Sequence, residues 1–445
     1  MEAALDPALR REAASAAPAP RSAPALARAR ASGERCVLIL SAHLPPSSVA
    51  GVHRARHLAA GLPAHGWRGV LVGARPDPGA PADPALAALV PPHVEQVRTG
   101  ALPAGPCRAI GIGDIGLRGY AAFGRALLRG ARLSGARTVL ITGSPFYPML
   151  LARRLVAAGL RVVLDFQDPW ARESPPGPGA KAALSWHLAH ALEPRALRHA
   201  HAVTSVSDEQ NRQMRARHPW LDVPMAAVPI GGDPDDAAIL GAHAPPRRAA
   251  GRAVLSYVGT FMPRSGAPMA ALLRAARLVS ERRPDLAFEL RFTGTSNRAE
   301  APGPGPVTAL ARALGAAHLV REAPARVSYA EALAHLAGAD ALLMVGSDEP
   351  HYTASKIYPN LMAGRPFVSL FHEASSAHAV LAGAGGGRAL SFGAGEDPSA
   401  RVPELADAIE AAAAGALSPP DPGACAPYAP EATAGRFAAL FERIA

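Results

Sequence analysis

The stretch that decides the fold spans residues 341–371 and reads ALLMVGSDEPHYTASKIYPNLMAGRPFVSLF. Its pattern predicts an apolar strand over 341–345, a polar loop over 346–353, a short helix over 355–362 and a second strand over 367–371. Two apolar strands joined through a helix form a right-handed βαβ unit, in which both strands lie parallel in one sheet. The sequence therefore predicts an α/β fold.

The helix of this unit begins near a lysine, which is a rare residue in this chain. Lys and Arg together number 46, but only Lys181 and Lys356 are lysines. A compact ammonium at a helix start, beside free backbone N–H groups and the hydroxyl of Ser355, suits a diphosphate. Lys181, in the loop-like GPGAK, shows that a lysine also survives by chance, so a plain surface role for Lys356 is the alternative.

Composition limits the classes of protein that the chain can be. Its 445 residues favour two domains, and 49% hydrophobic residues support well-filled cores. The net charge of +10 favours anionic partners such as nucleotides, phospholipid headgroups or polyprenyl phosphates. Nucleic acid is not expected, because no RNA-binding or helix-turn-helix motif accompanies the charge and aromatic residues are only 5%.

Cysteine usage and hydropathy indicate a location. Cys36, Cys107 and Cys425 lie far apart without a CxxC spacing, which argues against a disulfide framework and a zinc site. No uncharged apolar run reaches the ~18 residues of a transmembrane helix, and the N-terminus lacks the apolar core of a secretory signal. A soluble cytoplasmic protein is expected.

Strand and helix patterns alternate in two blocks. Residues 1–34 are expected to be a disordered tail, 35–230 an N-terminal domain, 231–252 a linker, 253–417 a C-terminal domain, and 418–445 a Pro-rich segment with an isolated helix. Further predicted strands span 36–40, 69–73, 138–142, 161–166, 202–206, 253–258, 287–293 and 318–320. Further predicted helices span 52–65, 119–134, 147–158, 180–199, 267–283, 307–314, 329–336, 403–414 and 430–444. Two Rossmann-like, doubly wound domains facing a central cleft are expected, with ligands at the C-terminal ends of the strands.

Candidate ligand-binding residues of the first domain follow its strands. The strand over 161–166 ends in DFQDPW, and Asp168 there could act as a base, bind a hydroxyl or simply cap a turn. Ser144 follows the preceding strand and would lie near Asp168. The first strand leads through a small-residue loop to Gly51 and Arg54, which suits close approach of a ligand to the backbone.

The second domain offers cations and helix starts. Gly259 ends a strand and lets a ligand approach the backbone, and Arg264 in the next loop offers a forked donor for phosphate. Arg264 and Lys356 follow different strands of one predicted sheet, so both are expected to converge on a diphosphate. Ser375 and Ser376 open a helix whose free N–H groups would also suit a phosphate.

Three other patterns in the sequence bear on ligand or membrane binding. The GxGxxG at 111–116 follows no convincing strand and is interpreted as chance, and the His187/His190 pair as a helix surface without metal. The segment 120–132 places Arg125, Arg129 and Arg132 on one helical face and Phe123, Leu127, Leu128 and Ala131 on another. A basic amphipathic helix of this kind predicts docking on anionic membrane, with an ordinary sheet-covering helix as the alternative.

Taken in order, these pieces resemble the GT-B glycosyltransferases, in particular retaining enzymes of the family-four type, over roughly residues 35–445. The similar stretches are SAHLPPSSVAGVHRARHLAAGLPAHGW (41–67), VVLDFQDPW (162–170), YVGTF (257–261), LRFTG (290–294), VSYAEALAHLAGADALLMVG (327–346) and TASKIYPNLMAGRP (353–366). The resemblance implies a nucleotide-sugar in the C-terminal domain, with Arg264 and Lys356 on its diphosphate and Gly51 near the donor phosphates. It also implies a base held near Arg321 and Glu322, an acceptor in the N-terminal domain, and no metal or other cofactor.

One departure from the family bears on activity. Its members commonly carry two glutamates eight positions apart ahead of the AxxAGxP-like helix end, and His351 and Pro359 stand at those positions here. The leading hypothesis is a retaining glycosyltransferase that uses a UDP- or GDP-sugar and a glycan or lipid-linked acceptor in cell-envelope or exopolysaccharide assembly. The alternatives are a catalytically silent GT-B protein that binds a nucleotide or glycan for a partner enzyme, and a sugar-nucleotide epimerase.

Overall fold

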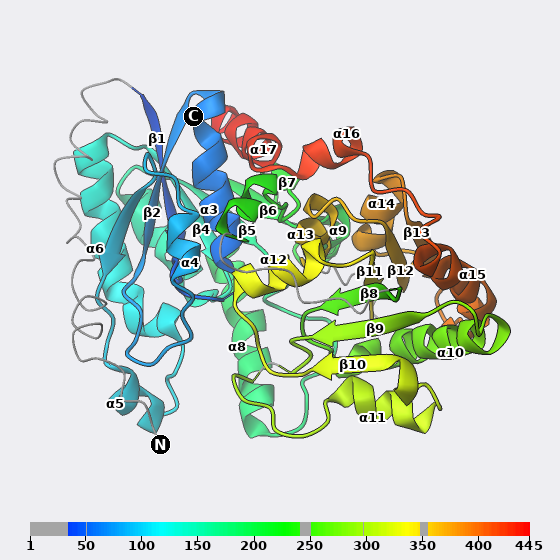
Figure 1. Ribbon diagram of the computed structural model, residues 1–445. Helices are drawn as coiled ribbons and strands as arrows, with labels where there is room; N and C mark the ends of the chain where they lie inside the picture. Colours follow the sequence, from blue (N-terminus) through cyan, green and yellow to red (C-terminus); the bar gives the residue numbers. More distant parts are fainter. Residues whose placement is uncertain (1–33, 50, 241–250, 297, 348–354) are drawn as a thin grey trace, which may run out of the picture.

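The computed structural model describes residues 34–49, 51–240, 251–296, 298–347 and 355–445. Two α/β domains lie side by side, each built on one parallel sheet with helices on both faces (Figure 1). The predicted class of two doubly wound domains is therefore confirmed. The tail expected over 1–34 falls, except for Glu34, outside the described residues, as does His351.

The first sheet has seven strands in the order β3-β2-β1-β4-β5-β6-β7. Its strands are β1 (Arg35–Ser41), β2 (Trp67–Ala74), β3 (Glu95–Thr99), β4 (Thr138–Gly143), β5 (Arg161–Phe166), β6 (Ala202–Ser205) and β7 (Met225–Ala227). In the central strand β1, Leu38 and Leu40 pack into the core on one face, and Val37 and Ile39 into the core on the other. An almost unbroken apolar run is what a strand buried on both faces requires, which is why β1 was predictable.

The helices of the first domain cover both faces of this sheet (Figure 1). They are α3 (Gly51–Gly61), α4 (Ala85–Ala88), α5 (Ala104–Ala109), α6 (Ile115–Ser134), α7 (Ala152–Ala157), α8 (Ala180–Leu197) and α9 (Asp208–Arg217), with 3₁₀ turns η1 (Leu62–His65) and η2 (Tyr147–Leu151). The GxGxxG stretch lies between α5 and α6, where Asp114 caps α6 through the N–H of Leu117. The helix α5, and not a strand, comes directly before it, which agrees with its interpretation as a chance match.

The second sheet has six strands in the order β10-β9-β8-β11-β12-β13. They are β8 (Ala253–Val258), β9 (Phe288–Thr293), β10 (Val320–Ala323), β11 (Ala341–Val345), β12 (Phe367–His372) and β13 (Arg388–Phe392). The helices are α10 (Gly266–Arg282), α11 (Pro306–Ala313), α12 (Tyr329–Ala337), α13 (Ile357–Met362), α14 (Ser376–Gly383) and α15 (Val402–Ala413), with 3₁₀ turns η4 (Pro263–Ser265), η5 (Ala317–Leu319) and η6 (Pro398–Arg401). β11 and β12 pair in parallel around α13, as the opening βαβ pattern predicts.

The strands that the sequence missed lie at sheet edges. β3 and β7 are the two edges of the first sheet and β13 is an edge of the second. An edge strand has one neighbour and is only partly buried, so its sequence carries a weaker apolar pattern. The strand predicted over 318–320 is displaced, because Ala317–Leu319 form the turn η5 and pairing with β9 starts at Val320.

The last helix returns to the first domain. After α16 (Pro422–Cys425) and the turn η7 (Ala426–Tyr428), α17 (Pro430–Arg443) packs on α3 and the first sheet (Figure 1). Phe437 and Phe441 are buried there, and the ring centroid of Phe441 lies 5.3 Å from that of Trp67. A Cβ on Gly61 would lie 2.4 Å from the carbonyl oxygen of Pro430, so only glycine permits this approach. The helix expected to be isolated therefore completes the first core.

The helix α6 covers the sheet rather than presenting its apolar stripe to a membrane. Phe123, Leu127 and Ala131 are buried in the first core, while Arg125 and Arg129 face solvent. The sequence-based assignment of this apolar stripe to a membrane is thus corrected. Among the described helices, none combines the length and apolar character needed to cross a bilayer.

Candidate active site

A cleft between the two domains contains Lys356, one of the residues that the resemblance assigns to the donor. It has a volume of about 500 Å³ and is lined from the first domain by residues that include Ser48 and His53, and from the second by Gly259, Tyr329 and Lys356. Contacts across it hold the domains together: the backbone N–H of Tyr329 donates to Asp83 at 2.7 Å. The cleft lies at the C-terminal ends of β8 and β9, where doubly wound sheets bind ligands.

Lys356 stands at the N-terminal end of α13 and reaches back toward β8. Its Nζ donates to the hydroxyl of Tyr257 at 2.5 Å and to the carbonyl oxygen of Thr260 at 3.3 Å, and it lies 4.3 Å from the Tyr257 ring centroid. Gly259 passes beneath it with a φ of +126°, and a Cβ there would lie 3.3 Å from the lysine side chain. A phosphate in the cleft would meet this ammonium together with Ser355, which lines the same wall.

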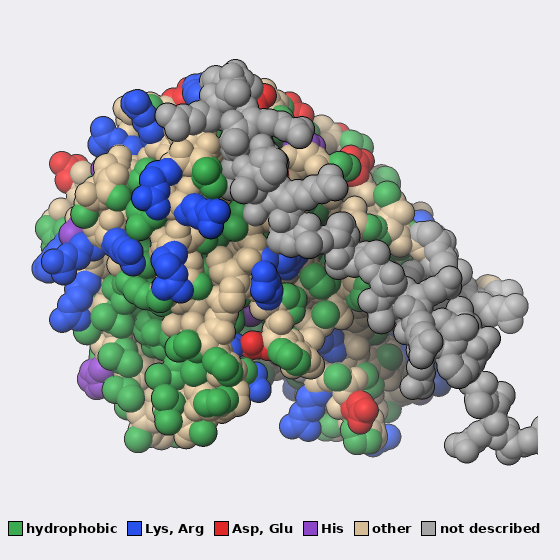
Figure 2. Space-filling model, turned by 90° about the vertical axis from the view of Figure 1, so that its left-hand side faces the viewer, with side chains coloured by type: hydrophobic (Ala, Val, Ile, Leu, Met, Phe, Trp, Pro, Cys, Tyr) green, Lys and Arg blue, Asp and Glu red, His purple; other side chains and the backbone are tan. Residues whose placement is uncertain are grey.

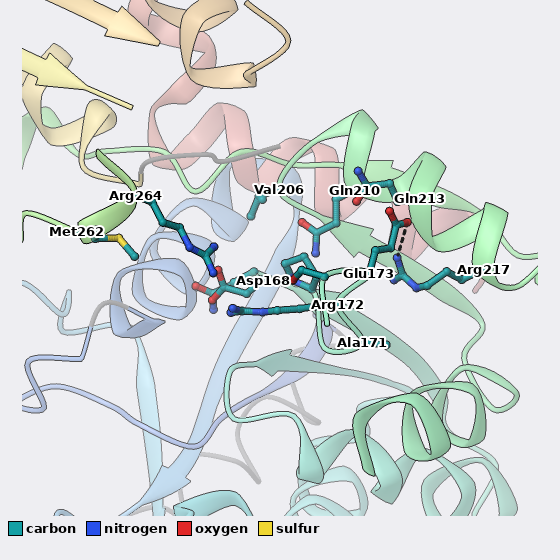
Figure 3. Close-up of a pocket in the computed structure, with 13 residues that line it drawn as sticks. Asp168, Ala171, Arg172, Glu173, Val206, Gln210, Gln213, Arg217, Met262 and Arg264 are labelled. Atoms are coloured by element: carbon teal, nitrogen blue, oxygen red, sulfur yellow. Dashed lines mark ion pairs between the residues drawn. The ribbon is translucent and has the colours of Figure 1, made fainter. Parts of the chain in front are cut away.

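A second pocket, which we call the Asp168 pocket, opens beside the end of β5. Its volume is about 170 Å³, and its lining includes Gln167, Asp168, Arg172, Gln210 and Arg217 of the first domain, with Met262 and Arg264 of the second. Figure 3 shows Arg264 reaching across from the second domain toward Asp168.

Asp168 itself is suited to proton transfer. Its side chain is exposed to the pocket, yet desolvation by the surrounding walls raises the pKa of this carboxyl, and the nearby Arg172 guanidinium partly offsets the rise. A carboxylate with a raised pKa is a stronger base than one in water. No hydrogen bond of the described residues uses it as a helix or turn cap, so the capping alternative finds no support.

The two cations expected to converge line different pockets. Arg264 lines the Asp168 pocket and Lys356 lines the cleft. The reason is the short turn η4 after β8, which directs Arg264 outward toward the first domain while Lys356 folds back over Gly259. In this structure the two cations therefore lie in separate pockets rather than side by side. Gly51 lines neither pocket but lies close to Gln167 of the Asp168 pocket, because a Cβ there would be 3.6 Å from the Gln167 amide and 3.7 Å from the Ser144 carbonyl oxygen.

Arg54 is part of the scaffold and not of the acceptor surface. Its side chain is 2% exposed, and its guanidinium donates to both carboxylate oxygens of Asp165, at 3.1 and 2.6 Å, and to two backbone carbonyls at 2.7 Å. Thr142 and Thr204 donate to the same carboxylate at 2.7 Å each. All five donors of a guanidinium are thus directed at protein groups or buried, and the expected acceptor contact is corrected. This network joins α3 to β4, β5 and β6 beneath the site.

The other predicted donor residues also have local partners. Glu322 caps α11 by accepting from the N–H groups of Val307, at 3.2 Å, and Thr308, at 2.6 Å, and it does not line the cleft. Arg321 is exposed and Ser375 caps α14, and neither lines the cleft or the Asp168 pocket; the same holds for Ser376 and for Ser144.

Two groups that matter were missed by sequence reasoning. Glu193 is fully buried on α8 and accepts from the N–H of Ala171 at 2.9 Å and from His218 at 2.9 Å, so it holds the loop that follows Asp168. A buried acidic residue in a helix was the available signal.

The second missed group is a cluster in which α3 contributes two histidines and the 3₁₀ turn η3 (Pro234–Leu240), within the predicted linker, contributes Asp236. His53, His57 and Asp236 place possible ligand atoms within 4.8 Å of one another. The guanidinium of Arg56 already binds both oxygens of Asp236, at 2.7 and 2.5 Å, and the Tyr329 hydroxyl donates to Asp236 at 2.8 Å. Burial and Arg56 lower the pKa of His53 to about 3, so the cluster is close to charge balance without a further cation.

Comparison with known proteins identifies the architecture. Residues 50–231 match the model of the glycosyl transferase 4-like domain. The fold is GT-B. Solved structures of similar shape include a UDP-forming trehalose-phosphate synthase from Burkholderia xenovorans, which is 12% identical with a TM-score of 0.57 and covers 92% of this chain and 99% of its own. A glycosyltransferase from Rickettsia africae is also 12% identical, with a TM-score of 0.55 over 93% of this chain and 99% of its own.

The N-terminal domain of a trehalose-6-phosphate phosphatase from Candida albicans shares the shape as well, at 13% identity and a TM-score of 0.56, over 92% of this chain and 97% of its own. No curated protein matches the chain in sequence. The resemblance to GT-B glycosyltransferases of the family-four type is therefore confirmed at the level of fold and of the N-terminal domain.

Proposed function

We propose that the protein is a glycosyltransferase that moves a sugar from a UDP- or GDP-linked nucleotide-sugar to an acceptor. The observation that carries the proposal is the interdomain cleft, with the ammonium of Lys356 held over Gly259 at the strand ends. A fixed cation in a partly desolvated cleft stabilises the negative charge that a departing nucleoside diphosphate gains. We further propose that the reaction retains the sugar configuration and requires no metal or other cofactor, as the resemblance implies.

The acceptor is assigned to the Asp168 pocket. Asp168 orients the acceptor hydroxyl or takes its proton, and its raised pKa supports this role. Arg172 and Arg264 supply positive charge on either side of the carboxylate (Figure 3). The acceptor is a glycan or a lipid-linked glycan in cell-envelope or exopolysaccharide assembly, and the protein works in the cytoplasm in peripheral contact with the inner face of the membrane.

A panel of nucleotide-sugars tests the proposal directly. A cognate donor at about a hundred times its Kd stabilises the folded protein by about 2.7 kcal/mol, which a thermal shift detects. The same donor is then incubated without acceptor, and slow release of the nucleotide is followed. A panel in which no UDP- or GDP-sugar shifts the transition would refute nucleotide-sugar binding in the cleft.

A catalytically silent GT-B protein is the second candidate, because Pro359 stands in the cleft where the resembling enzymes carry a glutamate. The same experiment separates the two, since a silent protein gives the thermal shift without any nucleotide release or transfer. A sugar-nucleotide epimerase would instead convert the donor sugar into its epimer in the absence of acceptor.

A further inference from the structure

The outer face of the first domain carries a basic groove. Five arginines from three elements line a hollow of about 560 Å³: Arg98 of β3, Arg125, Arg129 and Arg132 of α6, and Arg154 beside them on α7. No acidic residue is among the described residues that line it, and no ion pair of the described chain involves Arg125, Arg129 or Arg154. Positive charge gathered in a concave surface attracts anionic groups.

One buried polar atom at the wall of the groove lacks a protein partner. The Oγ1 atom of Thr99, a residue that lines the groove, is buried without a hydrogen bond among the described residues. A buried hydroxyl without a partner is costly, so an anionic oxygen that reached it would relieve that cost. The guanidinium of Arg98 has its own partners, because its Nη2 donates to the side-chain oxygen of Gln96 at 2.7 Å and to the carbonyl oxygen of Pro45.

Exposed aliphatic side chains gather next to the groove, around α5 and the first turn of α6. Leu102 is 60% exposed and Ile110 is 72% exposed, with Ile112 and Leu117 at 38% and 37%. Arg118 fixes this part to the domain, because its guanidinium donates to the Leu102 carbonyl oxygen at 2.7 Å and to Asp77. Figure 2 shows this face, with basic side chains gathered in its upper half and hydrophobic side chains below them.

We propose that this face, defined by the arginine groove and the aliphatic residues around α5, docks on a bilayer that contains anionic phospholipid. Guanidinium groups bind phosphate by forked hydrogen bonds, and aliphatic side chains lying beside them enter the boundary between headgroups and acyl chains. This face gives a surface to the membrane contact of the proposed function, on which it rests. The exposed aliphatic residues around α5 supply the apolar contact that the sequence had assigned to the buried side chains of α6. The charge of the groove favours lipid over a protein partner, since its described lining holds arginines and no acidic residue, which matches a uniformly anionic plane.

Vesicle flotation without donor or acceptor tests the docking face, so its result is independent of any sugar transfer. The full-length chain is mixed with phosphatidylcholine vesicles, or with vesicles that also contain phosphatidylglycerol. We expect binding to the anionic vesicles alone, and release at ~0.5 M salt, where the screening length falls to a few ångströms.

Two variants test the arginines and the aliphatic residues of this face separately. Reversing the charge at Arg125, Arg129 and Arg154 to Glu reduces partitioning at least about a hundredfold, because each arginine near anionic lipid contributes roughly fivefold. Changing Leu102 and Ile110 to Ser reduces it by roughly tenfold for each buried side chain. A charge control makes the same reversal at three exposed arginines outside the groove, as Arg312→Glu with Arg388→Glu and Arg443→Glu. An apolar control replaces two exposed leucines away from α5, as Leu184→Ser with Leu188→Ser, whose side chains are 60% and 37% exposed.

Both controls are expected to bind like the unaltered protein, and circular dichroism checks that every variant is folded. Equal binding to neutral and anionic vesicles would overturn the proposal, as would an equal loss in the Arg312 control. Self-association that disappears in the Leu102/Ile110 variant, without vesicle binding by the unaltered chain, would assign the face to a second copy and also overturn it.

Discussion

The buried pair of Arg54 and Asp165 allows a stability prediction of defined size. Replacing Asp165 by Ala leaves the guanidinium of Arg54, which is 2% exposed, without the two carboxylate oxygens that it now contacts at 3.1 and 2.6 Å. The hydroxyls of Thr142 and Thr204 lose their acceptor as well. Removing one partner of a buried ion pair costs about 3–5 kcal/mol, since the remaining charge stays buried without compensation.

Tryptophan fluorescence in urea measures this loss in the first domain alone. The four tryptophans are Trp67, Trp170, Trp186 and Trp220, and all lie in that domain, so the second domain does not contribute to the signal. With a slope of about 2 kcal/mol per molar urea, the transition midpoint falls by about 1.5–2.5 M. The control is Glu442→Ala, which breaks a pair with Arg35 at 2.9 Å whose side chains are each 52% exposed, and it costs less than about 1 kcal/mol.

A double variant makes the reasoning refutable. Arg54→Met combined with Asp165→Leu removes both charges together, so it is expected to be more stable than Asp165→Ala alone. A midpoint for Asp165→Ala within the error of the Glu442→Ala control would show that the pair does not support the domain. A double variant as unstable as the sum of two single losses would show that packing, and not the unpaired charge, determines the cost.

Three predictions concern the proposed reaction. Lys356→Ala should weaken binding of the cognate nucleotide-sugar by about 1.5–3 kcal/mol. Lys356→Arg should also bind it more weakly, because a planar guanidinium does not fit over Gly259. Titration calorimetry checks both variants, and unchanged affinity would exclude Lys356 from the site. Asp168→Asn should lower turnover by roughly 10²–10⁴ with donor affinity kept, whereas lost thermal stability with normal specific activity would mark Asp168 as structural. Arg172→Ala removes a charge that lowers the pKa of Asp168, so the acid limb of the activity profile should move to higher pH; Arg217→Ala is the control, since Arg217 pairs with Glu173 and Glu193 instead.

Local sequence determined the order of the secondary structure and the class of the fold. The strand predicted over 161–166 has those bounds as β5, and the strand predicted over 253–258 has them as β8. Both are interior strands, so their apolar runs are set by burial on two faces and can be recognised without knowing their neighbours. The positions of Asp168 and Lys356 at or near strand and helix ends followed from the same periodicity.

Only the tertiary structure decided which of the charged side chains are paired within the protein and which face a pocket. Arg54 and Asp165 are 111 residues apart in the chain, and only the pairing of α3 with the first sheet shows that each neutralises the other. The return of α17 to the first core and the separation of Arg264 from Lys356 depend on packing angles and on a single 3₁₀ turn, which leave no periodic pattern in the sequence. Periodicity reports burial, whereas the partner of a charge is set by contacts between distant segments, and the sequence does not state which segments meet.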